Sequence, residues 1–236
     1  MSPFDFDTPI DRRGTGSIKW DKYRDRDIIP LWVADMDFSC PPRVIAALHN
    51  RVEHGIFGYT YPGQELTDAV LSMLNSCYDW QVQAAWIVWL PGLVTGLNLA
   101  CSAVANEGEE VITTVPIYPP FMSAPGNNGQ NLVKNPLLFR ENRWQLDLEH
   151  LSRSITDKTR LFLHCHPHNP AGRAFSKEEL FALWEVIRKQ NIVICSDEIH
   201  CGLILDEGMP HIPFASLSPQ IAERSITLMA PSKTYN

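Results

Sequence analysis

Between residues 86 and 229 the chain alternates short apolar runs with amphipathic stretches of helical length. Strands are predicted over residues 86–90, 110–115, 131–138, 160–164, 192–196 and 225–229. Helices are predicted over residues 92–105, 118–124, 147–154 and 176–190, the last with a Ser-x-x-Glu capping box. This alternation predicts an α/β fold in which helices cover both faces of a mainly parallel sheet, giving three layers.

The residues before this pattern show no sustained period at first. Residues 1–42 carry prolines and aromatic side chains, so we expect an arm that wraps the body of the protein or a neighbour. Within it, residues 30–38 form a strand-like apolar segment that ends in two acids. A helix is then predicted from Pro41-Pro42 to Gly55, and a second one over residues 65–78. The apolar face of the first helix carries Val44, Ile45, Leu48 and Val52.

Composition excludes several classes of protein. The formal net charge is −7, and without a basic surface to displace counterions from phosphates we expect no nucleic-acid partner. The acidic N-terminus lacks a secretory signal pattern, and no apolar run approaches the roughly 18 residues that a membrane span needs. The six cysteines include no Cys-x-x-Cys pair, so we expect reduced thiols, no metal site and a cytoplasmic protein. Cys201, next to His200, remains an alternative nucleophile.

Candidate ligand-binding residues follow several of the predicted strands at the point where each strand ends. Because the carboxyl ends of parallel strands meet at one edge of a sheet, ligands bind there, and these residues are expected to converge on one site. The residues in question are Gly92, Tyr118, Asn169, Asp197 and Lys233.

Lys233 and Asp197 indicate the chemistry of that site. They are separated by 233 − 197 = 36 residues, which leaves room for a loop excursion and a return strand. A lysine amine can bond covalently to an aldehyde, and a carboxylate can keep a pyridine nitrogen protonated. Together they predict a site for pyridoxal 5'-phosphate.

The neighbouring residues fit the same ligand, although each has a plainer interpretation when taken alone. Gly92-Leu-Val-Thr-Gly96 at a helix start favours a phosphate but is also typical of close packing, and the hydroxyls of Thr95 and Ser232 can donate to the same anion. Asn169 and His200 can approach the ring hydroxyl, or they form an Asn-Pro turn and a capping or core histidine. Tyr118 can stack on a flat ring or lie at the rim, and Ser-Lys-Thr is also a common surface turn.

Six short segments, in order and at characteristic spacing, carry a family resemblance. The chain resembles the fold-type-I pyridoxal-phosphate enzymes of the aminotransferase class I/II superfamily, and most closely the MalY/PatB branch of cystathionine β-lyases. The likeness extends from Phe4 to Asn236. The segments are residues 33–38 (Val-Ala-Asp-Met-Asp-Phe), 54–59 (His-Gly-Ile-Phe-Gly-Tyr), 116–118 (Pro-Ile-Tyr), 168–172 (His-Asn-Pro-Ala-Gly), 196–200 (Ser-Asp-Glu-Ile-His) and 232–236 (Ser-Lys-Thr-Tyr-Asn).

The resemblance assigns roles by position. It implies that Lys233 is the Schiff-base lysine and that Asp197 is the partner of the pyridine nitrogen. It also implies a cis peptide bond at Asn169-Pro170, which aims the asparagine at the ring. The other cofactor contacts that it implies are Asn169 and His200 at the ring hydroxyl, Tyr118 stacked on the ring, the backbone of Leu93 and Val94 at the phosphate, and Tyr59 donated across the interface of a homodimer.

Two departures from the family pattern qualify these assignments. Ala230 stands three residues before the lysine, where many relatives have a hydroxyl residue at the phosphate. The sequence also ends three residues after Lys233, whereas the family continues through a small domain and an arginine for the substrate carboxylate. We therefore expect a C-terminally truncated chain of a protein of roughly 390 residues, by resemblance. Residues 1–42 then belong to the arm or small domain, and residues 43–236 form an incomplete large cofactor-binding domain.

The resemblance favours a carbon–sulfur β-lyase that acts on cystathionine or related cysteine S-conjugates. An aminotransferase is the alternative, because the site residues are shared and the two reactions differ in where the proton returns. A non-catalytic fragment or a regulatory binding protein with this fold is a third possibility. The segments at 35–38 and 197–200 favour the lyase branch.

Overall fold

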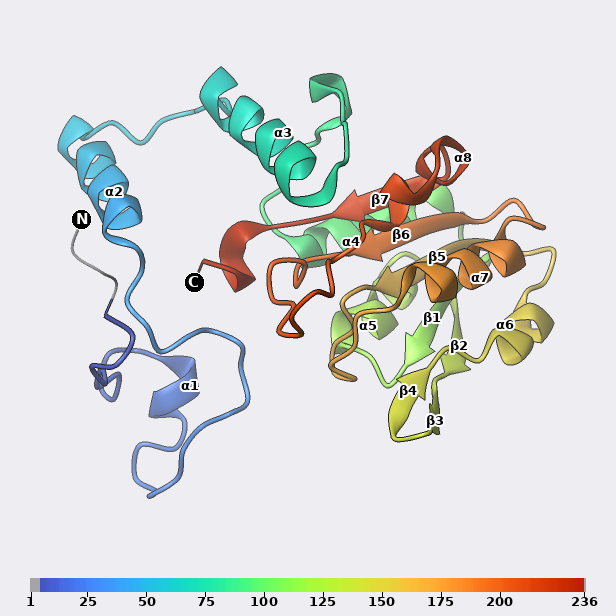
Figure 1. The fold of residues 1–236 in the computed structure, drawn as a ribbon, viewed down its shortest axis with the longest axis horizontal. Coiled ribbons are helices and arrows are strands. Elements are labelled where there is room, and N and C mark those ends of the chain that lie inside the picture. The colour runs from blue at the N-terminus through green and yellow to red at the C-terminus, as the bar shows by residue number, and fades with distance from the viewer. Residues whose placement is uncertain (1–4, 236) are drawn as a thin grey trace. The chain divides into compact units, whose positions relative to one another are not determined.

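The computed structural model describes residues 5–235, which form two structural units (Figure 1). The larger unit comprises residues 62–230. The smaller unit comprises the described residues up to Tyr61 together with those from Pro231 onward.

A five-stranded parallel sheet forms the centre of the larger unit, with the strand order β2-β1-β5-β6-β7. Its strands are β1 (Glu110–Val115), β2 (Asn131–Pro136), β5 (Thr159–Cys165), β6 (Val193–Asp197) and β7 (Ser225–Leu228). A separate antiparallel hairpin pairs β3 (Leu138–Arg140) with β4 (Arg143–Gln145). The predicted strand over 131–138 is therefore divided near Pro136, because proline has no N–H for a continuing ladder.

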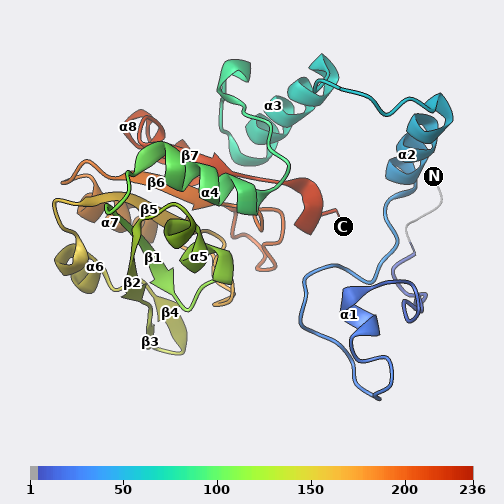
Figure 2. The ribbon, with the colours of Figure 1, turned by 180° about the vertical axis from the view of Figure 1, so that it is seen from behind.

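Helices cover both faces of this sheet (Figures 1 and 2). The helices of the larger unit are α3 (Gln64–Tyr78), α4 (Leu93–Val104), α5 (Pro119–Asn127), α6 (Leu148–Ser154), α7 (Lys177–Ile187) and α8 (Pro219–Ala222), with 3-10 turns η1 (Ala84–Trp86) and η2 (Phe214–Leu217). Apolar side chains of α4 and α5 pack on one face, and those of α6, α7 and η2 pack on the other. The predicted three-layer α/β architecture is confirmed.

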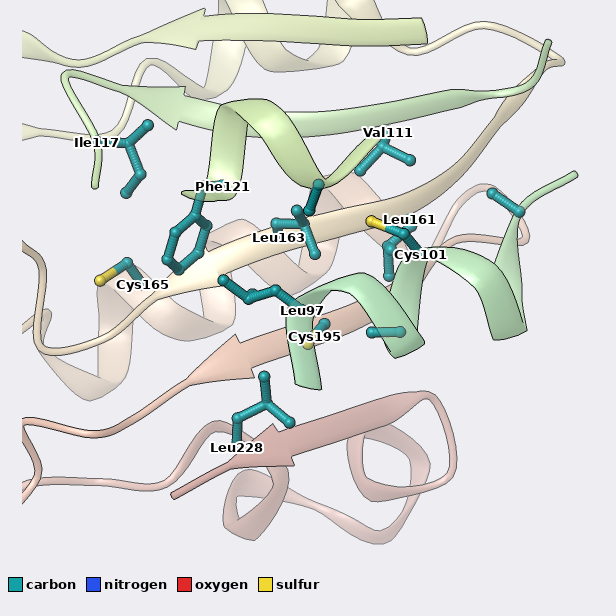
Figure 3. Packing of buried hydrophobic residues seen from close by; sticks show 13 residues of the cluster. Leu97, Cys101, Val111, Ile117, Phe121, Leu161, Leu163, Cys165, Cys195 and Leu228 are labelled. Carbon is teal, nitrogen blue, oxygen red and sulfur yellow. The ribbon is translucent and has the colours of Figure 1, made fainter. Parts of the chain in front are cut away.

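Alternation along β5 explains how one strand serves two cores. Leu161 and Leu163 face α4 and α5, whereas Phe162 between them faces α7. Side chains alternate across a strand, so a strand covered on both faces must be apolar at successive positions. Figure 3 shows Leu97 from α4 and Phe121 from α5 lying against this strand.

Helix starts in the larger unit follow from local sequence. The Ser176 hydroxyl accepts a hydrogen bond from the amide of Glu179, and the Glu179 carboxylate accepts one from the amide of Ser176. This is the predicted capping box, and it begins α7. Asp147 caps α6 in the same way through the amide of His150.

The strand predicted over residues 86–90 is wrong. Trp86 ends the 3-10 turn η1, and residues 87–90 pair with no strand among the described residues. The segment has strand composition, but Trp86 is 60% exposed and Val88 is 76% exposed. A strand needs hydrogen-bond partners as well as suitable residues, and composition cannot supply them.

The smaller unit contains α1 (Ile18–Asp21), α2 (Pro42–His54) and the 3-10 turn η3 (Pro231–Lys233). α2 matches the predicted helix, and Gly55 ends it with a φ of 72°, a left-handed conformation that glycine adopts without strain. The strand-like segment predicted at 30–38 is wrong, because it forms no strand.

Side-chain contacts determine the path of that segment. The Asp37 carboxylate accepts hydrogen bonds from Lys19 Nζ at 2.7 Å, Trp20 Nε1 at 2.7 Å and Arg12 Nη1 at 2.8 Å. Arg12 also pairs with Asp35 at 2.6 Å. These contacts hold the acids against the α1 region and replace a β-ladder. Burial alone would raise the pKa of Asp37, but the hydrogen bonds from Lys19, Trp20 and Arg12 hold it down at about 2.

Among the described residues, no helix is long and apolar enough to cross a membrane.

Shortening a buried apolar side chain in the larger unit should lower the stability of the fold. Leu163 is fully buried between α4 and α5, so Leu163→Ala is expected to lower the free energy of unfolding by about 2–5 kcal/mol through lost burial and a residual cavity. Leu205 is 92% exposed, and Leu205→Ala should stay within about 0.5 kcal/mol. Urea unfolding followed by circular dichroism measures both, and equal losses would contradict the proposed core.

Candidate active site

Asp197 ends β6, which lies between β5 and β7, at the carboxyl edge of the sheet. In the strand register it lies beside Cys165 of β5 and Leu228 of β7. Its side chain is buried, since the residue is 5% exposed. Its backbone carbonyl accepts from the amide of His166 at 2.9 Å, and its Oδ1 accepts from the amide of Ile199 at 3.1 Å. Neighbouring strands thus fix the position of this carboxylate.

Burial raises the pKa of Asp197 to about 6. The Ile199 amide opposes this shift, and the negative charge of Glu198 adds to it. A carboxylate with so few donors at a buried position gains strongly from a nearby cation. Asp197 therefore suits a cationic N–H donor.

Asn169 lies in the turn that follows β5, beside the same sheet edge. Its amide donates to Cys165 Sγ at 3.4 Å, and the Cys165 thiol donates to the carbonyl of Pro167 at 3.4 Å. Burial raises the pKa of this thiol to about 12, so it stays protonated and able to donate. The Asn169-Pro170 peptide bond is cis, which confirms that prediction.

The N-terminus of α4 presents Leu93, Val94 and Thr95. The first intrahelical bond runs from the amide of Gly96 to the carbonyl of Gly92, and no side chain caps this end among the described residues. The amides of the first turn therefore lack helical partners, and the helix dipole favours an anion there.

A glycine allows α4 to pack at the end of β7. A Cβ at Gly96 would lie 3.0 Å from Leu228 Cδ2, closer than side chains normally approach. Leu228 is the register neighbour of Asp197, so this close approach brings the start of α4 to the same edge of the sheet as the carboxylate.

Tyr118 follows β1 and precedes α5 at its N-cap position. It is 43% exposed, so its ring is available at the carboxyl edge. His200 lies in the turn after β6, three residues beyond Asp197, and is partly buried.

The structure brings together most of the predicted residues at one edge of the larger unit. These are Leu93, Val94, Thr95, Tyr118, Asn169, Asp197 and His200. The other three predicted residues, Tyr59, Ser232 and Lys233, belong to the smaller unit. Ser232 and Lys233 lie in η3, which begins directly after residue 230, and Tyr59 is fully exposed. Their roles stay predictions.

Cys165, Glu198 and His211 were not predicted from the sequence to belong to the site. Glu198 and His211 form a buried pair with 2.8 Å between Oε2 and Nε2. The two residues are 13 positions apart in the sequence. His211 lies in an irregular segment, so no hydrophobic periodicity indicates that its side chain is buried against Glu198.

The fold and this sheet edge define a parallel α/β scaffold with a buried carboxylate and a helix start whose amides lack helical partners. Residues 26–235 match the family Aminotransferase class I and II, and the chain belongs to that family.

Individual proteins of known name or structure are also similar to this chain. Cystathionine beta-lyase PatB of Bacillus subtilis is 42% identical over 98% of this chain and 61% of its own length. The crystal structure of OvoB has a TM-score of 0.94 and 44% identity, covering 99% of this chain and 62% of that one. The PLP-bound C-S lyase from Staphylococcus hominis has a TM-score of 0.91 and 32% identity, covering 99% and 60%. The chain thus spans about three fifths of the length of these relatives.

Asp197 should make the stability of the cofactor-free protein depend on pH. Unfolded, its pKa is about 3.9, and folded it is about 6. Between roughly pH 4 and 6 the folded state alone holds the proton, so the free energy of unfolding falls as the pH rises, by on the order of 3 kcal/mol in total. Asp197→Asn is therefore expected to be more stable than wild type above about pH 6, and the two should converge below about pH 4.

Urea unfolding of the cofactor-free proteins across this range measures the effect. The exposed Asp206 provides a matched control, since Asp206→Asn should follow wild type at each pH. A stability difference between wild type and Asp197→Asn that is constant across the range would contradict the burial penalty.

Proposed function

We propose that this protein is a pyridoxal-phosphate-dependent carbon–sulfur β-lyase. It cleaves cystathionine or a related cysteine S-conjugate, with one water, to a thiol, pyruvate and ammonia. The observation that carries the proposal is the buried Asp197 at the carboxyl edge of the sheet, next to a helix start suited to phosphate. The similarity to a cystathionine beta-lyase and to a C-S lyase favours this substrate class.

The donor set at this edge fits the cofactor. The amides of Leu93 and Val94 would hold its phosphate, because they lack helical partners, and the Thr95 hydroxyl would add a donor. Asp197 would bind the protonated ring nitrogen, since a buried carboxylate with a raised pKa gains most from a cation. The remaining contacts would be Tyr118 on the ring face, Asn169 and His200 at the ring hydroxyl, Ser232 at the phosphate, and Lys233 as the covalent anchor.

When bound, pyridoxal phosphate withdraws electrons from the substrate Cα, so that a proton is lost there and the sulfur substituent leaves from Cβ. Lys233 has two functions in this proposal. Its amine holds the cofactor until the substrate amine replaces it, and it then takes the Cα proton as general base. Asp197 keeps the ring nitrogen protonated throughout, and Asn169 orients the ring.

Several finer features belong to the same proposal. The protein acts in the cytoplasm on an amino-acid substrate and works as a homodimer, in which Tyr59 of one subunit contributes a cofactor contact across the interface. Residues 1–42 form an arm or part of a small domain, and residues 43–236 belong to the large cofactor-binding domain.

Release of pyruvate distinguishes the lyase from its closest alternative. An aminotransferase of this family would need a keto-acid acceptor and would return the proton to the cofactor carbon. The test incubates the purified protein with pyridoxal phosphate and cystathionine, without a keto acid, and follows pyruvate with lactate dehydrogenase and thiol with a disulfide reagent. Equal amounts of pyruvate and thiol are expected.

Two other results would replace the proposal. Amino transfer that appears only when a keto acid is added would identify an aminotransferase, which the family assignment also accommodates. Cofactor binding without either activity would identify a non-catalytic or regulatory protein with this fold.

A further inference from the structure

The face of the sheet opposite to Asp197 contains a buried polar cluster that the proposed chemistry does not use. Cys195 and Asp197 alternate with Ile194 and Ser196 along β6, and Cys195 packs toward α4 whereas Ile194 packs toward α7. Asp197 therefore lies on the α4 side and its neighbour Glu198 on the α7 side. The cluster consists of His164, His166, Ser196, Glu198 and His211, all at most 5% exposed.

Three donors hold the Glu198 carboxylate. Its Oε1 accepts from the Ser196 hydroxyl at 2.8 Å and from the amide of Phe214 at 2.9 Å, and its Oε2 accepts from His211 Nε2 at 2.8 Å. The side chain is completely buried. The carboxylate thus ties the end of β6 to the segment 211–214.

His211 is fixed in turn by its neighbours. Its ring centroid lies 4.8 Å from that of His166 and 5.4 Å from that of Tyr78 in α3. His166 donates from Nε2 to the carbonyl of Ile212 at 3.1 Å and accepts at Nδ1 from the amide of Phe175. The imidazole of His211 consequently has little freedom to turn away from Glu198.

This anchoring bears directly on Asp197. The amide of Glu198 donates to the carbonyl of Leu228 at 2.8 Å, and the amide of Ile199 donates to Asp197 Oδ1. Fixing the Glu198 side chain on one face of the strand end therefore fixes the adjacent Asp197 carboxylate on the other. A buried pair of polar side chains is a poor source of stability compared with apolar packing, so stability alone does not account for the Glu198–His211 contact.

We propose that Glu198 and His211 are positioning residues, which hold the end of β6 so that the Asp197 carboxylate faces the ring nitrogen of the cofactor. The inference rests on the proposed function, because it assumes that pyridoxal phosphate binds at this edge.

The groups around the pair allow a clean measurement. The titratable side chains that face it are His166 from the end of β5, Tyr78 from α3, Cys201 from the turn after β6, and Asp197 itself. Burial lowers the pKa of His166 and raises the pKa values of Tyr78 and Cys201, so these three are uncharged near neutral pH. A change in the titration of the cofactor ring then reports on Asp197 and the pair.

The experiment uses pyridoxal phosphate labelled with 15N, whose ring-nitrogen shift in NMR spectra reports protonation independently of turnover. His211→Leu is expected to lower the pH at which the bound ring nitrogen loses its proton, and to lower kcat by about 10- to 100-fold, the range for outer partners that orient metal ligands. His211→Gln keeps a donor near Glu198 and should recover most of both effects. His164→Leu removes a fully buried imidazole whose ring nitrogens make no hydrogen bond within the described residues, and it should leave the ring titration unchanged.

The outcomes separate the two proposals. A wild-type protein that does not bind pyridoxal phosphate overturns the proposed function and this inference together. A wild type that binds it overturns this inference alone, and identifies the pair as structural, if His211→Leu titrates like wild type or if His211→Gln titrates no closer to wild type than His211→Leu does. Melting temperatures of the variants show whether lost stability accompanies the change, and a ring titration that shifts equally in His164→Leu also refutes the positioning role.

Discussion

Replacing Lys233 with alanine is expected to abolish turnover and to remove the visible absorbance of the bound cofactor. Lys233 follows β7, and β7 is the register neighbour of the strand that ends at Asp197. Alanine removes both the covalent anchor and the general base that the proposal assigns to this amine. The absorbance spectrum of the purified variant and its pyruvate release from cystathionine measure the two losses separately.

A matched lysine controls for general effects of removing a positive charge. Lys158 is exposed in the turn that precedes β5, so it lies at the amino end of that strand and not at the carboxyl edge of the sheet. Lys158→Ala should keep both the spectrum and the rate. Near-normal β-elimination by Lys233→Ala would remove this lysine from the proposed mechanism.

Much of the fold was predictable because the sequence repeats one simple unit. The strand β1 was predicted with its observed bounds, and β6 and β7 within one residue. Strands such as β5 are apolar on both faces, which is typical of a buried parallel sheet. The segment 86–90 has the same composition and failed, because pairing depends on residues distant in sequence.

One geometric rule, that parallel strands end at a common edge of the sheet, was enough to predict part of the site. Parallel strands end at one edge, so Tyr118, Asn169 and Asp197 could be grouped from sequence alone, and the structure places them there. The contacts that orient these residues could not be found in this way. The Cys165 thiol and the Glu198–His211 pair are buried, and the hydrogen bonds they make form only in the folded chain.

Asp197→Asn is expected to lower the rate of β-elimination by roughly 100- to 1000-fold while changing cofactor occupancy much less. That range is the usual loss when one key electrostatic group is removed from an active site. Asparagine is nearly isosteric and can still accept from the amide of Ile199, so the sheet edge should keep its shape. It carries no charge, however, and cannot hold the proton on the ring nitrogen.

The measurement separates occupancy from rate. Equilibrium dialysis with pyridoxal phosphate gives the occupancy of wild type and Asp197→Asn, and pyruvate release at saturating cofactor gives kcat. The exposed Asp206 again provides the control, since Asp206→Asn should match wild type in both. If excess pyridoxal phosphate restores the full rate of Asp197→Asn, the carboxylate serves only to retain the cofactor. A persistent loss at full occupancy is expected instead, because the charge acts during the removal of the Cα proton and not in binding alone.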